Sequence, residues 1–243
     1  MRTNNPMLRE DTLQNASASS EAMTINGAVG KTLIMLLLLV ATSMYSYVQV
    51  MNHKMNISVM MGAMIIAAIV AIATTFIPRI SPVTAPIYAA VEGIVLGSVS
   101  AMFTLQAGDS IVLQAVLLTF AILFAMLILY ATRIIRVTDK FRMAVLSATL
   151  GVVILYVGTA VLHLFGVQVP FLHDGGTVSI IVSAIIIVIA SLNLVLDFDF
   201  IETGASQRAP KYMEWYGALG LMLTLVWLYF EILRFISYFT RND

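Results

Sequence analysis

Seven runs of about twenty mostly apolar residues divide this chain, and they constrain its fold more than any other feature. An α-helix of about 20 residues, rising 1.5 Å per residue, crosses the roughly 30 Å hydrocarbon core of a bilayer. The connections between the runs are short, which leaves no room for a soluble catalytic domain. The predicted spans are Lys31–Val50, Ile57–Phe76, Pro86–Leu105, Ile111–Ala131, Met143–Phe165, Val178–Leu196 and Tyr216–Phe239.

The composition supports the same class of protein. Of the 243 residues, 60% are hydrophobic and 11% are charged, whereas soluble domains are about 25% charged. We therefore expect an all-α integral membrane protein whose first partner is the lipid bilayer. The formal net charge is zero and no segment resembles a nucleic-acid-binding module, so we expect no nucleic-acid partner. Cysteine is absent and the three histidines are scattered, so we expect no resident metal or other cofactor.

The Lys and Arg residues predict the orientation of the spans. Residues 1–30 are polar and predict a disordered cytoplasmic tail, followed by a transmembrane domain over residues 31–243. With the N-terminus in the cytoplasm and the C-terminus outside, ten of the thirteen basic residues fall on the cytoplasmic side. These ten are Arg2, Arg9, Lys31, Arg79, Arg133, Arg136, Lys140, Arg142, Arg208 and Lys211.

The third span carries small residues at every fourth position: Ala85, Ala89, Gly93, Gly97 and Ala101. Lipid tails provide no hydrophobic drive between helices, so such a stripe allows a second backbone to approach closely. It predicts internal helix packing, with a dimer face as the alternative. Glu92 beside the stripe is either a protonated, hydrogen-bonded carboxyl or part of an ion or proton path.

The last two spans carry the other acidic groups at membrane depth. On the sixth span Asn193 and Asp197 share a face, and Asp199 points to roughly the opposite side. On the seventh span, small and polar residues recur in steps of three and four and end in Glu231 and Arg234. Such a stripe suits a helix at the centre of the bundle. Ionisable side chains in spanning helices are costly, so they are functional candidates by default.

Simpler interpretations exist for each of these acids. Arg234 follows Glu231 by three residues and can be its counter-ion. Asp199 and Glu202 fall at the cytoplasmic boundary, where a charge is readily solvated. For Asp197 both the structural and the functional interpretation stay open.

Three segments resemble the Bax inhibitor-1 family, the transmembrane Bax-inhibitor-motif proteins, in its bacterial branch. They are APIYAAVEGIVLGSVSAMF, LDFDFIE and APKYMEWYGALGLMLTLVWLYFEILRF, and the resemblance extends from about Lys31 to the C-terminus. It implies seven helices with the last one central, a bacterial cytoplasmic membrane, and a pH-sensitive calcium leak.

The resemblance also assigns roles to individual residues. Family members carry one acid near the end of the sixth helix and one in the seventh, which share a proton and sense pH. Asp197 matches the first position, and Glu231 matches the second, where aspartate is usual. Arg79 is the nearest match to the arginine that latches the first acid in some members.

A carboxyl pair of this kind would form a pH switch. Two carboxylates about 4 Å apart repel by roughly 4 kcal/mol at an effective dielectric constant near 20, so the pair would hold one proton. The protonated pair would join two helices by a hydrogen bond. The deprotonated pair would attract a cation, and its oxygens suit Ca²⁺, which makes Asp197 and Glu231 a weak calcium site as well.

We therefore predict a pH-sensitive, calcium-permeable leak channel gated by Asp197 and Glu231. Arg79 is a candidate latch, and Glu92, Asn193, Asp199 and Arg234 are candidates for lining or supporting the path. Two alternatives stay open: a proton-coupled secondary transporter, and a non-transporting regulator that binds a membrane partner such as a protease. No hydrolase or metalloprotease motif is present, so we do not expect an enzyme.

Overall fold

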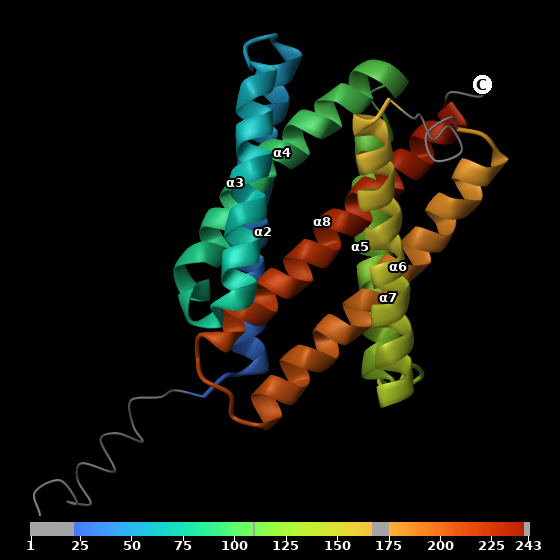
Figure 1. The fold of residues 1–243 in the computed structure, drawn as a ribbon. Helices are drawn as coiled ribbons and strands as arrows, with labels where there is room; N and C mark the ends of the chain where they lie inside the picture. The colour runs from blue at the N-terminus through green and yellow to red at the C-terminus, as the bar shows by residue number, and fades with distance from the viewer. Residues whose placement is uncertain (1–21, 109, 167–174, 241–243) are drawn as a thin grey trace, which may run out of the picture.

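Seven long helices form the bundle (Figure 1). The structure is a computed structural model that describes residues 22–108, 110–166 and 175–240. The helices are α2 (Ile25–Met51), α3 (Ile57–Phe76), α4 (Ser81–Ala107), α5 (Ser110–Ala131), α6 (Asp139–Leu164), α7 (Thr177–Ser206) and α8 (Met213–Thr240). A short 3-10 turn, η2 (Pro78–Ile80), precedes α4. All seven helices are long and apolar enough to cross a membrane, which confirms the predicted spans and the all-α class.

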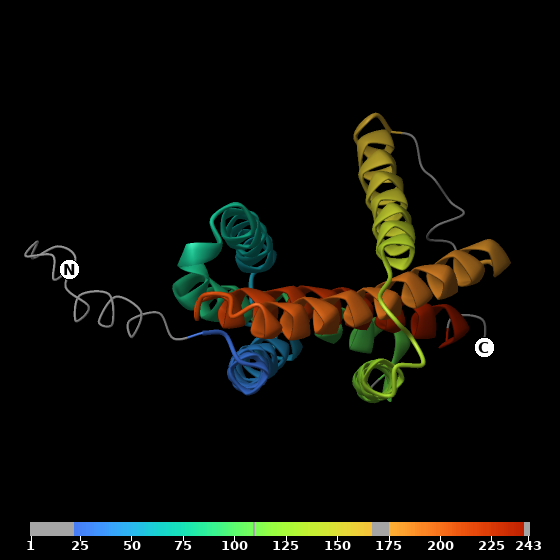
Figure 2. The same ribbon diagram turned by 90° about the horizontal axis from the view of Figure 1, so that it is seen from below.

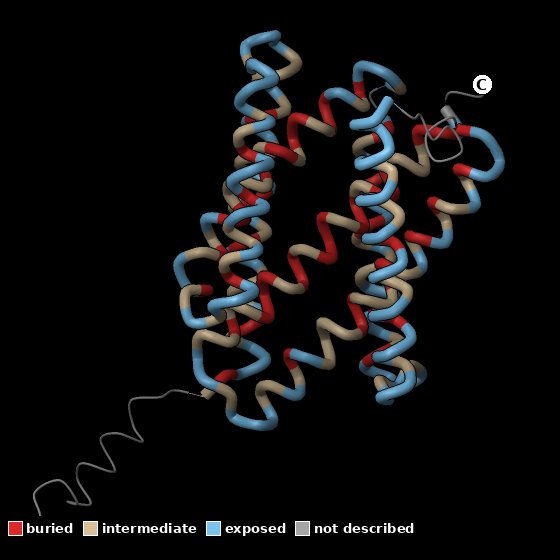
Figure 3. The backbone as a smooth tube through the Cα atoms, viewed as in Figure 1, coloured by how far each residue is buried: buried red, intermediate tan, exposed pale blue. Residues whose placement is uncertain are grey.

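The C-terminal helix α8 lies at the centre of the bundle, as its small-and-polar stripe predicts. It contacts α2, α4, α5 and α7, and buried residues follow one another along it (Figure 3). Figure 2 shows α2 and α5 on one side of the α7–α8 pair, and α3 and α6 on the other. The two sides of this central pair therefore face different surroundings.

The small residues of α4 pack against α2. A Cβ added at Gly97 would overlap the backbone of Ser43, and one added at Gly93 would overlap Leu39 and Thr42. Ser46 of α2 extends this contact by hydrogen-bonding the Ile94 carbonyl (2.8 Å) and the Ser98 hydroxyl (2.7 Å). The stripe is therefore an internal packing surface, as predicted.

Three helix ends differ from the sequence prediction by five residues or more. α2 begins at Ile25 because Thr24 caps it, accepting a hydrogen bond from the Gly27 amide (3.0 Å). Residues 25–30 thus belong to the first helix and not to the polar tail, whose residues 1–21 lie outside the described part of the chain. α4 begins at Ser81, five residues before the predicted start.

The third difference matters most for function. α7 continues ten residues beyond the predicted end at Leu196, so Asp197, Asp199 and Glu202 are all helical. This segment contains no proline, and its one glycine, Gly204, stays within the helix. The helix ends before the turn that contains Pro210, because proline cannot continue a helix.

The α2–α4 contact predicts a matched pair of glycine variants. Gly97→Leu should lower the unfolding temperature in detergent, because the new side chain overlaps α2 and overpacking costs about 1–3 kcal/mol or more. Gly151→Leu on α6, where nothing lies within 4 Å of an added Cβ, is the control. Heating each variant and measuring the remaining monodisperse fraction checks this, and equal unfolding temperatures would contradict the packing described.

Candidate functional site

A polar cleft lies on the α3 and α6 side of the central α7–α8 pair. Its volume is about 560 Å³, and its walls come from Thr75 of α3, Arg142 and Leu146 of α6, and facing residues of α7 and α8. Asn193, Asp197 and Asp199 of α7 all line it. It lies toward the end of the bundle where the turn joins α7 to α8.

Asp197 points from α7 toward α8. Gly220 faces it and leaves room for the carboxyl: a Cβ added at Gly220 would lie 3.5 Å from Asp197 Oδ1. The Thr224 hydroxyl, one turn further along α8, lies beside the same carboxyl and donates to the Gly220 carbonyl (3.2 Å). The second oxygen, Oδ2, is buried and accepts no hydrogen bond from any described residue. Asp197 is therefore a carboxyl on a membrane-spanning helix with no basic side chain bonded to it among the described residues.

Glu231 has a different environment. It is 4% exposed and accepts hydrogen bonds from the Tyr156 hydroxyl of α6 and from Arg234, which also forms an ion pair with it. Arg234 in turn donates to the Tyr156 hydroxyl and lies 5.2 Å from the centre of its ring. The sequence alternative, in which Arg234 is the counter-ion of Glu231, is the arrangement observed.

The structure does not bring Asp197 and Glu231 together. Asp197 faces Gly220 and Thr224, and Glu231 lies seven residues beyond Thr224, which is about 10 Å along the helix. Thr224 occupies the position on α8 that faces Asp197, where the prediction expected an acid. Asp197 and Glu231 therefore do not form the predicted carboxyl pair. The axial position of α7 relative to α8 places Asp197 opposite Gly220 and Thr224 instead.

The other two acids of α7 are paired with bases. Asp199 accepts a hydrogen bond from Arg142 of α6 at 2.7 Å. Glu202, one turn further along α7, pairs with Arg133 and accepts a hydrogen bond from Tyr130. Asp197 and Asp199 therefore line one cleft while facing different neighbours.

Asn193 joins α7 to α6. Its amide nitrogen donates to the Thr149 hydroxyl (2.8 Å) and to the Ile189 carbonyl (2.9 Å). With Arg142–Asp199 and Tyr156–Glu231, this makes three polar links from α6 at residues 142, 149 and 156, one every seven residues. Val145 and Val152, both buried, lie between them on the same face.

The two other predicted candidates lie apart from Asp197. Arg79 is exposed in the turn η2, and no hydrogen bond or ion pair joins it to Asp197. Glu92 is half-buried on α4, beside the glycines that pack on α2. Neither a latch nor a continuous path through Glu92 is therefore visible in the described residues.

Sequence reasoning missed two clusters. The fully buried Glu214 at the start of α8 accepts hydrogen bonds from the Thr24 amide (2.8 Å), the Thr24 hydroxyl (3.0 Å) and Lys31, and so anchors α2 to α8. The other is the Tyr156 contact of Glu231. The seven-residue spacing of polar residues in the fifth span was the signal for it, although the distant partner could not be read from spacing.

The cleft could hold a cation only weakly. Within the described residues, no group of three or more His, Asp or Glu side chains is arranged to hold a metal ion. Asp197 supplies a carboxylate, and the Asn193 amide oxygen and nearby hydroxyls supply neutral oxygens of the type that Ca²⁺ accepts.

Seven spanning helices around a central C-terminal helix, with ionisable side chains between them, define a polytopic α-helical integral membrane protein. The family model described as Bax inhibitor 1 like matches residues 5–241, and the chain therefore belongs to that family. A comparison with curated proteins gives no match.

The Tyr156 cluster predicts a specific loss of stability. Tyr156→Phe removes the hydroxyl that joins α6 to Glu231 and Arg234, and should destabilise the protein by about 1–3 kcal/mol because the buried Glu231 and the partly buried Arg234 lose a partner. Thermal unfolding in detergent measures the effect. Tyr45→Phe, at a tyrosine that is 63% exposed on α2, is the control and should leave the unfolding temperature unchanged.

Proposed function

We propose that the protein is a pH-sensitive, calcium-permeable leak channel of the membrane, and that Asp197 is its pH-responsive group. One observation carries the proposal: a carboxyl on a membrane-spanning helix lines a polar cleft, with one oxygen buried and unbonded among the described residues. Four other acids, Asp199, Glu202, Glu214 and Glu231, each form an ion pair with Lys or Arg. An ionisable group without such a partner inside a membrane is a functional candidate.

Protonation of Asp197 changes what the cleft attracts. The neutral acid can donate its proton to a neighbouring oxygen and carries no charge, so it offers little to a cation. The carboxylate adds a negative charge beside the Thr224 hydroxyl and other neutral oxygens, which favours entry of Ca²⁺. Asp199 cannot do the same while Arg142 neutralises it. Calcium flux should therefore rise as Asp197 ionises with increasing pH.

A shared proton is not needed in this proposal. Thr224 can donate to a carboxylate or accept from a carboxylic acid, so a single carboxyl can switch between two hydrogen-bonded states. Sharing with Glu231 would require α8 to move by about two turns against α7. We assign pH sensing to Asp197, and we assign to Glu231 and Arg234 a structural role, since both are bonded to the Tyr156 hydroxyl that joins α6 to α8.

We further propose the orientation that the basic residues predict. The turn between α7 and α8 then lies at the cytoplasmic end, and the Asp197 cleft lies nearer the cytoplasm than the Glu231 cluster. The membrane would be the bacterial cytoplasmic membrane, as the family resemblance implies.

Calcium flux from proteoliposomes across a series of pH values tests the proposal. Asp197→Asn mimics the neutral acid and should give a low flux that varies little with pH. Asp199→Asn, on the same helix and in the same cleft, is the matched control and should keep the pH dependence of the parent. A parent-like pH profile in Asp197→Asn would overturn the assignment.

A second variant tests the role of the facing position. Thr224→Asp would place a second carboxyl opposite Asp197, and repulsion between the two would delay ionisation and move the flux midpoint to higher pH. Glu231→Gln should leave the midpoint unchanged while lowering the unfolding temperature. Saturable uptake of one solute would favour a transporter, and inert liposomes with a co-purifying partner would favour a regulator.

A further inference from the structure

An apolar groove lies on the side of the central pair opposite the Asp197 cleft. α2 and α5 form its two side walls (Figure 2), and α8 lies at its floor together with parts of α4 and α7. The two walls are separated, since α2 and α5 make no substantial contact with each other while both contact α8. Two cavities of about 360 and 410 Å³ occupy the gap.

The two cavities form one continuous groove. Along α2 the lining residues recur every three or four positions without a break: Ile25, Val29, Leu33, Leu36, Val40, Met44 and Val48. The α5 wall continues likewise from Val112 to Ala131. On the floor, Leu221 belongs to one cavity and Met222 to the other. A single elongated molecule could therefore occupy both.

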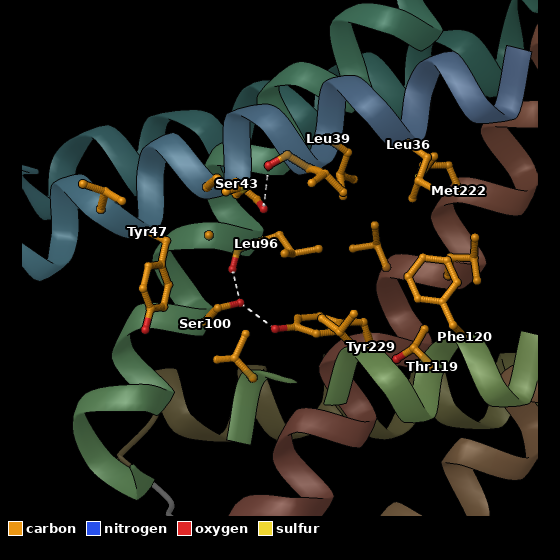
Figure 4. A pocket seen from close by; sticks show the side chains of 18 residues that line it. Leu36, Leu39, Ser43, Tyr47, Leu96, Ser100, Thr119, Phe120, Met222 and Tyr229 are labelled. Carbon is orange, nitrogen blue, oxygen red and sulfur yellow. Dashed lines mark hydrogen bonds between the residues drawn. The ribbon is translucent and has the colours of Figure 1, made fainter. Parts of the chain in front are cut away.

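The part of the groove farther from the α5–α6 turn is lined almost entirely by apolar groups. Figure 4 shows the Tyr229 hydroxyl pointing to Ser100, and the two share a hydrogen bond of 2.7 Å. Thr119 donates to the Ala115 carbonyl (2.7 Å) and Ser43 to the Val40 carbonyl (3.2 Å). The polar groups of this lining are thus already bonded within the protein, and no charged residue lines this cavity.

The other end of the groove carries polar side chains and an ion pair. Tyr130, Arg133 and Glu202 line it, beside the turn between α5 and α6. The Arg133 side chain remains 55% exposed although it pairs with Glu202, so its guanidinium keeps N–H groups that can bind an anion. The α5 wall is about 21 Å long from Val116 to Tyr130. It is therefore longer than the hydrocarbon layer of one leaflet, which is about 15 Å thick.

We propose that this groove binds one phospholipid, with an acyl chain along the floor of α8 and the phosphate at Arg133. The occupant is a lipid because the groove opens between spanning helices, its depth is apolar, and its charged end offers a guanidinium that phosphate can match. The lipid comes from the leaflet next to the α5–α6 turn. It completes the packing that α2 and α5 leave open, independently of any ion conduction.

Photochemical labelling tests the placement of the chain. The protein is reconstituted with a phospholipid that carries a diazirine on its acyl chain, and the labelled residues are mapped by mass spectrometry. Label is expected on Met222, Leu225 and Tyr229, which are 1–7% exposed and line the groove. Label confined to exposed faces such as that of α6 would show bulk lipid contact only and overturn the proposal.

Two pairs of variants sharpen the test. Val116→Trp fills the groove and should reduce the α8 label at least fivefold, whereas Val153→Trp on the exposed face of α6 should leave it unchanged. Arg133→Gln should reduce the lipid retained in native mass spectrometry severalfold, whereas Arg208→Gln in the exposed α7–α8 turn should not. Undiminished α8 labelling in Val116→Trp, or unchanged retention in Arg133→Gln, would overturn the proposal. The second pair remains decisive if Val116→Trp does not fold.

Discussion

Helices inside a bilayer gain nothing from hiding apolar surface, because lipid tails are as apolar as the side chains themselves. This protein depends on the two kinds of contact that remain, namely close backbone approach and polar bonds. Gly93 and Gly97 allow α4 to lie against α2. Glu214, bonded to Thr24 and Lys31, fixes the start of α8 to the start of α2.

α6 depends on polar bonds more than the other helices do. It has only two buried residues, Val145 and Val152, and stands at the edge of the bundle. Its links through Arg142, Thr149 and Tyr156 are spaced by seven residues, so they lie on one face at three depths of the membrane. These links leave the rest of α6 free to face lipid.

Much of the fold could be predicted from the sequence. Apolar run length predicts the seven spans, the four-residue spacing of small residues predicts the α4 packing surface, and the stripe on the last span predicts its central place. These signals are local, because each depends on the periodicity of one helix. The pairing of Glu231 with Arg234 was likewise readable, since the two residues lie on one turn of one helix.

The partner of Asp197 could not be predicted in the same way. Which residue of α8 faces it depends on where α7 ends, and the helix continues to Ser206 instead of stopping at Leu196. A shift of α8 by two helical turns along its axis would bring Glu231 to the position that Thr224 occupies opposite Asp197. The periodicity of each helix would stay the same. Distance along a single helix is encoded in sequence, whereas register between two helices follows from packing over their whole length.

Asp197 and Phe198 are neighbours in sequence and face opposite sides of the central pair, as do Gly220 and Leu221 of α8. The first residue of each couple lines the polar cleft, and the second lines the apolar groove. The α7–α8 pair is thus a wall one helix thick, with an acid on one surface and an aromatic ring on the other. A rotation of α7 about its axis cannot reorient Asp197 without also reorienting Phe198. The polar and apolar surfaces of this wall therefore change together.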